Sequence, residues 1–174
     1  MIDRVIDRLA SQTRRIAIST DDATIATHCA AYSILPDPLP DQPGPLAGIL
    51  AALTDAASKG RDALDAILSA PCDTPFLPDD LVARLWAMEA AQTGRIAVPM
   101  SYGRAHYTTA LWPVSAATVI EDLLNAGERR VGAALERIGM VAVDWSDTQP
   151  DPFANINTPD ALIAAEKRAK KEGG

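Results

Sequence analysis

The chain has few aromatic residues and little positive charge. Only 5% of its 174 residues are Phe, Trp or Tyr, so a core must be built mainly from Ala, Leu, Ile and Val. Acidic residues outnumber basic ones, and the formal net charge is −7. That balance argues against a non-specific nucleic-acid binder, which needs a basic surface. It leaves an anionic small substrate open, provided that a metal ion or local arginines offset the repulsion.

Cysteines and long apolar runs are also scarce. The two cysteines, Cys29 and Cys72, form no metal-ligand pattern, so we expect no structural disulfide and a reduced, cytoplasmic setting. No stretch is apolar over the length that a membrane span needs, and the charged, periodic N-terminus is unlike a signal peptide. With 48% hydrophobic and 22% charged residues, the composition is globular, and the length favours a single domain over residues 1–174.

Short apolar runs alternate with helical periodicity along the chain. The expected strands are 15–19, 32–35, 63–70, 96–98, 108–112 and 141–145, and the expected helices are 2–11, 22–31, 46–57, 78–91, 119–126, 130–138 and one that begins at Thr158. This alternation predicts an α/β fold with a doubly wound, mostly parallel sheet. The run at 63–70 is apolar on both faces, which is typical of a central parallel strand.

In such sheets ligands bind beyond the carboxyl ends of the strands, where Ser19, Asp37 and Asp73 stand. Asp73 follows the predicted central strand and lies between Pro71 and Pro75, which restrict the backbone. A carboxylate held at a strand end suits Mg²⁺, which binds one or two carboxylates plus substrate phosphates. The alternative is a turn-forming Asp that bonds its own backbone. Asp37, taken alone, is more often a turn residue than a ligand.

Two further segments have the residue types that bind phosphate. Gly44-Pro45-Leu46 can present backbone amides at a helix start. However, Gly-Pro is also common in the loop before a helix that binds no ligand. Arg129 and Arg130 can clamp a phosphate bidentately. The alternative is a solvated helix start, and the residues alone favour this alternative.

Amides and a histidine complete the set of candidates. Asn155 and Asn157 alternate along an extended segment, so both can face a ligand edge, or they can cap the last helix. His106 is more often a satisfied loop histidine than a catalytic base. The sequence pattern indicates no Ser/His/Asp triad and no zinc site, and Cys72 has no obvious activating base.

Five blocks of the sequence, in order, resemble the molybdenum cofactor guanylyltransferases. The blocks span most of the chain and comprise residues 44–48, 71–81, 126–131, 143–147 and 153–159. That family transfers GMP from GTP to molybdopterin and releases pyrophosphate. The resemblance implies a Rossmann-type three-layer sandwich like that of the nucleotide-diphospho-sugar transferases.

The resemblance also assigns roles to the candidate residues. It implies that Asp73 is catalytic and holds Mg²⁺ near the GTP phosphates. It places Asp37 in the nucleotide site, and Ser19 stands where the family usually has an asparagine. The block that begins at Gly44, Pro45 and Leu46 is assigned to the nucleotide as well. The residues that match the pterin side are Arg129, Asn155 and Asn157.

The beginning of the chain departs from the family. The family starts with a strand and a glycine-rich loop that cradles the triphosphate, whereas this sequence opens inside what resembles the following helix and has no glycine before Gly44. We therefore expect a sheet without its first strand, which normally lies beside the strand that ends near Asp73. Such a gap either closes by movement of neighbouring strands or is filled by a second molecule, which implies self-association.

The departure keeps two other functions open. One is an impaired or non-catalytic relative that binds the molybdenum cofactor or a partner molybdoenzyme. The other is a cytidylyltransferase that uses CTP, because base choice depends on loops that the sequence does not assign.

Overall fold

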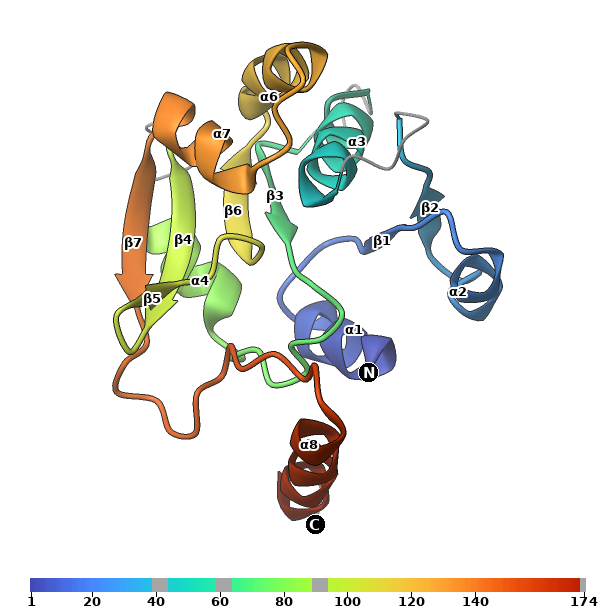
Figure 1. Ribbon diagram of the computed structural model, residues 1–174, viewed down its shortest axis with the longest axis vertical. Helices are drawn as coiled ribbons and strands as arrows, with labels where there is room; N and C mark the ends of the chain where they lie inside the picture. The colour runs from blue at the N-terminus through green and yellow to red at the C-terminus, as the bar shows by residue number, and fades with distance from the viewer. Residues whose placement is uncertain (39–43, 59–63, 89–93, 173–174) are drawn as a thin grey trace.

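Helices and strands alternate over much of the described chain, as the periodicity predicts (Figure 1). The exceptions are residues 96–113, where three strands follow one another, and residues 116–138, where two helices do. The computed structural model describes residues 1–38, 44–58, 64–88 and 94–172. The helices are α1 (Ile2–Ala10), α2 (Ala23–His28), α3 (Pro45–Ser58), α4 (Leu81–Ala87), α6 (Ala116–Asn125), α7 (Val131–Ile138) and α8 (Pro159–Glu172). The strands are β1 (Ala17–Ser19), β2 (Ser33–Leu35), β3 (Ala66–Ser69), β4 (Ile96–Ser101), β5 (Arg104–Ala105), β6 (Ala110–Pro113) and β7 (Met140–Asp144).

Local signals fix several helix ends. Asp22 caps α2, because its side chain accepts hydrogen bonds from the backbone amides of Thr24 and Ile25. Thr158 does the same for α8, with its hydroxyl 3.2 Å from the amide nitrogen of Ala161. The predicted extension of the 78–91 helix beyond residue 88 lies outside the described residues, as does the predicted strand start at residue 63.

The strands form two sheets. β1 and β2 pair in parallel and make a small sheet of their own. In the larger sheet the order is β3-β6-β4-β5, and β7 pairs in parallel with β4. β6 is antiparallel to both β3 and β4, so β3, β4 and β7 share one direction.

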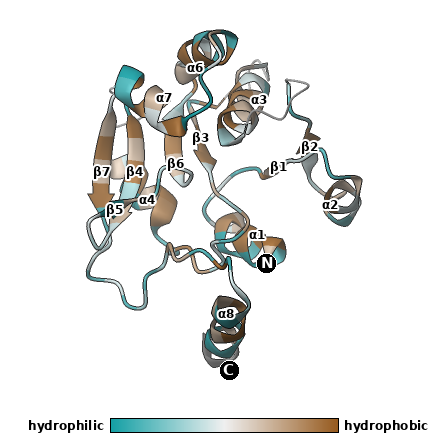
Figure 2. Cartoon of the chain, viewed as in Figure 1, coloured by the Kyte–Doolittle hydropathy of each residue, from teal (hydrophilic) through white to brown (hydrophobic). Residues whose placement is uncertain are grey.

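Helices cover both faces of the larger sheet. On one face α3, α6 and α7 pack on side chains that include Ile96, Val98 and Trp112. On the other face α1 and α4 pack on Ala97 and Leu111. Side chains therefore alternate between two cores along β4 and β6, because successive residues of a strand point to opposite faces. Figure 2 shows hydrophobic residues along β3, β4 and β7 of this sheet. This arrangement confirms the predicted doubly wound α/β class.

Strands β5 and β6 run antiparallel to the other strands of the larger sheet, and the connections that lead into them explain why. Tyr102 and Gly103, with φ of 48° and 75°, form a tight turn between β4 and β5, and such a two-residue turn joins antiparallel strands. The next connection, closed by a hydrogen bond from the amide of Thr109 to the carbonyl of His106, brings the chain into β6 without a helix. The polar turn is visible in the sequence, but its consequence for strand direction was not part of the prediction.

The strand that leads to Asp73 lies at an edge of the larger sheet and not at its centre. In the described part of the chain β3 pairs only with β6, and all its residues are half-buried. Between β3 and β1 lies a cavity of about 310 Å³. Its lining includes Ala17 of β1, Ile67 of β3 and Trp86 of α4. The structure thus leaves the two sheets apart, and the predicted closure of the gap by neighbouring strands is wrong.

Two smaller expectations concern membranes and thiols. None of the helices in the described part of the chain combines the length and apolar character that a membrane span needs. Cys29 is buried and Cys72 is exposed, and both are free thiols, in agreement with the expected absence of a disulfide between them.

Candidate active site

Asp73 lies in the turn that follows β3, at the carboxyl end of that strand, as predicted. The turn is closed by the hydroxyl of Thr74, which donates to the carbonyl of Pro71 at 2.9 Å. Thr74 is 2% exposed, so the turn is anchored in the protein while the carboxylate beside it is only half-buried. Asp73 is thus held on a short, restricted segment that suits a fixed ligand position.

A segment from the other end of the chain packs against this turn. The backbone amide of Ile156 donates to the carbonyl of Asp73 at 2.9 Å. The side-chain amide of Asn155 lies 3.3 Å from Oδ2 of the same residue. Asn157 is exposed two residues further along. The structure therefore brings Asp73 and Asn155 together, which the sequence could suggest only through the family.

The second carboxylate oxygen of Asp73 fits a cation. Oδ1 is buried and accepts no hydrogen bond from the described residues. A buried carboxylate oxygen without a donor is costly unless a ligand satisfies it. In the described chain no group of three or more acidic, histidine or cysteine side chains surrounds it. A single carboxylate oxygen of this kind is compatible with a divalent cation that takes its other ligands from phosphate oxygens and water.

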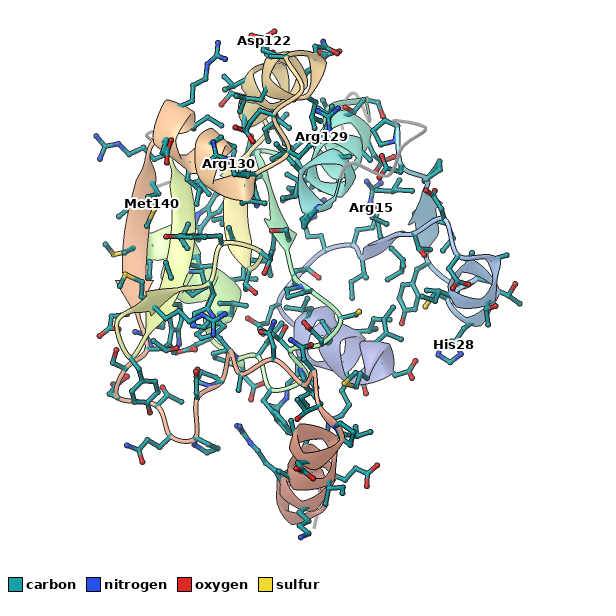
Figure 3. All side chains as sticks on the ribbon, viewed as in Figure 1. Arg15, His28, Asp122, Arg129, Arg130 and Met140 are labelled. Atoms are coloured by element: carbon teal, nitrogen blue, oxygen red, sulfur yellow. The ribbon has the colours of Figure 1, made fainter. Side chains whose placement is uncertain are left out.

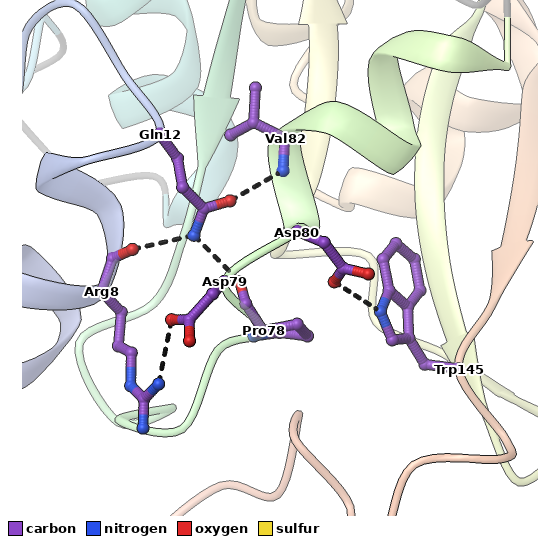
Figure 4. Close-up of polar contacts among 7 residues, drawn as sticks. All are labelled: Arg8, Gln12, Pro78, Asp79, Asp80, Val82 and Trp145. Atoms are coloured by element: carbon purple, nitrogen blue, oxygen red, sulfur yellow. Dashed lines mark hydrogen bonds and ion pairs between the residues drawn. The ribbon is translucent and has the colours of Figure 1, made fainter.

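A glutamine at the end of α1 fixes the chain beyond Asp73 (Figure 4). Gln12 Nε2 donates to the carbonyl oxygens of Arg8 at 2.8 Å and Pro78 at 2.9 Å. Its Oε1 accepts from the amide of Val82 at 3.0 Å, in the first turn of α4. One side chain thereby ties α1 to the start of α4. Sequence analysis missed Gln12, because a lone polar residue after a helix carries no pattern.

The nucleotide-side candidates gather at the small sheet and the start of α3. Ser19 is the last residue of β1, and its hydroxyl lies against α3 at Gly48. A Cβ at Gly48 would lie 2.7 Å from Ser19 Oγ, so only glycine allows this approach. Asp37 follows β2, and its backbone amide donates to the Asp21 side chain at 3.1 Å. Sequence analysis did not assign this packing role to Gly48.

Residues 44–46, where α3 begins, can contact a ligand through their backbone more than through their side chains. Gly44 has φ of 86°, a conformation that favours glycine. Pro45 opens α3, where a missing N–H costs nothing. Leu46 is fully buried in the core, so its side chain cannot contact a ligand. Only the backbone amides of this first turn are available, as the sequence suggested.

Arg129 lies apart from Asp73. Its guanidinium donates to the carbonyl of Leu124 at 2.7 Å and thereby covers the carboxyl end of α6. Figure 3 shows it beside α6, whereas the turn after β3 lies at the opposite end of the sheet (Figures 1 and 3). Its neighbour Arg130 pairs with Glu128 at 2.7 Å, and this hydrogen bond lowers the pKa of Glu128 to about 2. Both guanidinium groups have protein partners here.

Comparison with known proteins identifies the family to which this chain belongs. The MobA-like NTP transferase domain matches residues 1–138. The chain belongs to the MobA-like NTP transferases. It is 43% identical over 176 residues to the molybdenum cofactor guanylyltransferase of Rhodobacter capsulatus, covering 98% of this chain and 83% of the relative. It is 38% identical over 173 residues to that of Rhodopseudomonas palustris (strain BisB5), covering 99% and 82%.

A solved structure agrees on the fold. The molybdopterin-guanine dinucleotide biosynthesis protein A of Archaeoglobus fulgidus superposes with a TM-score of 0.74 at 24% identity, covering 98% of this chain and 85% of that one. The family resemblance and the Rossmann-like architecture expected from the five sequence blocks are therefore confirmed.

Proposed function

We propose that this MobA-like NTP transferase is a guanylyltransferase that transfers GMP from GTP to molybdopterin. Two observations support the proposal together. The relatives at 37–43% identity are named molybdenum cofactor guanylyltransferases, and Asp73 offers a buried, unsatisfied carboxylate oxygen at a strand end. The reaction joins a terminal phosphate of molybdopterin to the α-phosphorus of GTP and releases pyrophosphate, so the number of phosphoanhydride bonds is unchanged.

The Asp73 turn serves the phosphates in this proposal. Asp73 Oδ1 would hold Mg²⁺, which supplies neutralisation of the charge that builds up on the transferred phosphoryl group. Asn155 keeps the carboxylate oriented by donating to Oδ2. Because the chain carries a net charge of −7, a cation is the simplest way to admit a triphosphate beside a carboxylate.

The remaining candidates are assigned around this centre. We propose Ser19, Asp37 and the segment Gly44–Leu46, through the N–H groups of Gly44 and Leu46, for the nucleotide, and Asn155 and Asn157 for the pterin side. Arg129 uses Nη1 for the carbonyls of Leu124 and Glu128, so the N–H donors that we propose for the pterin side are the others of its guanidinium. The setting that we propose is the cytoplasm, where GTP is made and thiols such as Cys29 stay reduced.

A second copy of the chain is the partner that we propose for the cavity between β1 and β3. In the described residues each of these strands pairs on one side only, so both present backbone donors and acceptors toward the cavity. Open strand edges are templates for pairing with another chain. Self-association of this kind would satisfy groups that the monomer leaves unpaired.

One experiment tests the proposed reaction. Purified protein is incubated with molybdopterin, Mg²⁺ and either GTP or CTP, and pyrophosphate release is measured. Release with GTP, and much less with CTP, is the expected result. Release with CTP alone would favour the cytidylyltransferase. Binding of molybdopterin with no release from either nucleotide would favour the non-catalytic relative.

A further inference from the structure

A buried polar cluster joins the end of β4 to the segment that carries Asn155. Ser101, the last residue of β4, is 1% exposed, and its hydroxyl contacts two side chains. One is His106, whose Nε2 lies 2.7 Å from Ser101 Oγ. The other is Asp151, whose Oδ1 lies 2.9 Å away. No sequence motif predicts this cluster, because its three members are separated along the chain.

The protons in this cluster have one consistent arrangement. A carboxylate only accepts, so the hydroxyl hydrogen of Ser101 goes to Asp151. The hydroxyl oxygen must then accept from His106, which places a proton on Nε2 of the imidazole. Burial lowers the pKa of His106, an effect larger than the opposing attraction of Asp151. Ser101 therefore stands in the middle of the cluster, and this is not the order of a nucleophilic triad, in which the histidine accepts from serine.

Asp151 also links the cluster to the backbone of the residues that follow it. The same Oδ1 accepts from the amide of Phe153 at 3.0 Å. The Phe153 ring is 1% exposed, stacks on His106 with centroids 4.7 Å apart, and meets Trp145 edge-on at 5.5 Å. The backbone at Phe153 is thus fixed by one carboxylate and two aromatic neighbours.

Asn155 is held between two anchored residues. Phe153 precedes it with the contacts just described, and Ile156 follows it, 8% exposed, with its amide on the carbonyl of Asp73. Asn155 itself is exposed and makes one side-chain hydrogen bond, to Asp73. Its position therefore depends on the anchors on either side more than on packing of its own side chain.

We propose that Asp151 is a positioning residue that holds Asn155 against Asp73. The hydrogen bonds of Asp151 go to the Ser101 hydroxyl and the Phe153 amide, so it acts on Asn155 through the backbone between them. It receives the Ser101 hydroxyl on one side and the Phe153 amide on the other, and so sets the course of the chain toward Asn155. The consequence for phosphate and cation binding rests on the function proposed above for Asp73, whereas the positioning itself does not.

The test uses three variants of the full chain. Asp151→Ala removes the acceptor of both hydrogen bonds. Asp151→Asn keeps a side-chain oxygen of the same shape and is the rescue variant. Ile120→Val removes one buried methylene group from α6, in the core on the other side of the sheet, and is the control for general loss of stability.

Two readouts separate positioning from function. The first is the side-chain amide signal of Asn155 in a ¹⁵N-correlated NMR spectrum, assigned with Asn155→Ala, which reports the contact with Asp73 directly. The second is the affinity for GTP in the presence of Mg²⁺, measured by calorimetry. In Asp151→Ala we expect the Asn155 signal to move to the position of an amide in water and the affinity to fall about tenfold. Asp151→Asn restores most of both, and Ile120→Val changes neither.

Each other result decides against one claim. An unchanged Asn155 signal in Asp151→Ala overturns the positioning role, as does an equal shift in Ile120→Val. If the signal moves but the affinity for GTP stays, Asp151 positions Asn155 without consequence for the site, and the proposal fails in its functional part. If the parent protein does not bind GTP with Mg²⁺, the proposed function fails while the NMR comparison still decides the positioning role.

Discussion

Asn155 and Asp73 are 82 residues apart in the sequence, yet the amide of one donates to the carboxylate of the other at 3.3 Å. This contact occupies Oδ2 and leaves Oδ1 buried and without a donor from the described residues. The pair therefore combines an oriented carboxylate with one free coordination position. It is the feature of the molecule that most directly supports a bound cation.

The first prediction concerns this carboxylate. Asp73→Ala should abolish the dependence of GTP affinity on Mg²⁺, because it removes the buried oxygen Oδ1 that we propose to hold the metal. Stability should change little, since the fold at this turn rests on Thr74 and on backbone hydrogen bonds. Calorimetric titration with and without Mg²⁺ measures the first effect, and thermal unfolding the second. A variant that binds GTP as well as the parent in Mg²⁺ would refute the role of Asp73.

The second prediction concerns Gln12, which makes three hydrogen bonds between α1 and α4. Gln12→Ala leaves the part-buried amide of Val82 without its acceptor, so we expect a loss of about 1–3 kcal/mol in the free energy of unfolding. The control is Arg137→Ala, which breaks a half-exposed ion pair with Asp122 at 3.7 Å. That change should cost no more than about 1 kcal/mol. Urea unfolding of both variants gives the comparison, and equal losses would contradict the bridging role of Gln12.

The fold followed from the sequence wherever periodicity and local chemistry decide it. The apolar positions of α1, the start of the last helix at Thr158 and the strand before Asp73 are all local signals, and the structure has them where they were expected. The edge position of β3 could not be predicted in this way, because a run that is apolar on both faces looks the same at an edge and at a centre. Strand direction in β4–β6 was missed because a tight turn between strands was not distinguished from a crossover.

The site was predictable only in part. Asp73 was singled out by its place after a strand, and Asn155 and Asn157 by their alternation along an extended segment. The structure brings Asn155 to Asp73 and leaves Asn157 exposed. The cluster of Ser101, His106 and Asp151 was not found, because contacts between distant residues leave no spacing rule in a single sequence. His106 contacts the Ser101 hydroxyl at 2.7 Å, as expected of a histidine that is satisfied within the protein.

The third prediction concerns the contact between Ser19 and Gly48. A Cβ at Gly48 would meet Ser19 Oγ at 2.7 Å and Ser19 Cβ at 3.3 Å, so Gly48→Ala must displace the end of β1. Alanine is otherwise better than glycine in a helix by about 1 kcal/mol. We therefore expect Gly48→Ala to give little or no gain in stability in the parent, but a gain of about 1 kcal/mol when Ser19 is also changed to Gly. A double-mutant cycle of unfolding free energies measures this coupling, and additive effects would show that the contact is not tight.

The fourth prediction concerns the pH dependence of stability. Burial lowers the pKa of His106 from its ordinary value of 6.5, with Asp151 raising it and Arg104 lowering it by smaller amounts. The unfolded chain therefore binds a proton more readily than the folded one, and stability must fall as the pH drops from about 7 through the lowered pKa. His106→Gln should remove this part of the slope between pH 7 and 5. His28→Ala, at an exposed ion pair with Asp3, should keep it. An unchanged slope in His106→Gln would contradict the assignment.

The last prediction concerns the cavity between β1 and β3. If a second copy fills it, the protein should show a concentration-dependent dimer in sedimentation velocity, because the strand edges on both sides of the cavity remain open in the monomer. Ala17 lies on β1, is exposed and lines the cavity, so Ala17→Lys places a charge in the path of a pairing strand without disturbing the core. This variant should shift the dimer toward monomer by at least about tenfold in dissociation constant, the effect of about 1.4 kcal/mol.

Thr24→Lys is the matched control for Ala17→Lys. It makes the same change in net charge at an exposed position of α2 that is not part of the cavity lining. If both variants weaken the dimer equally, the effect is one of overall charge and the interface lies elsewhere. A parent protein that stays monomeric over the whole concentration range would exclude self-association through this cavity.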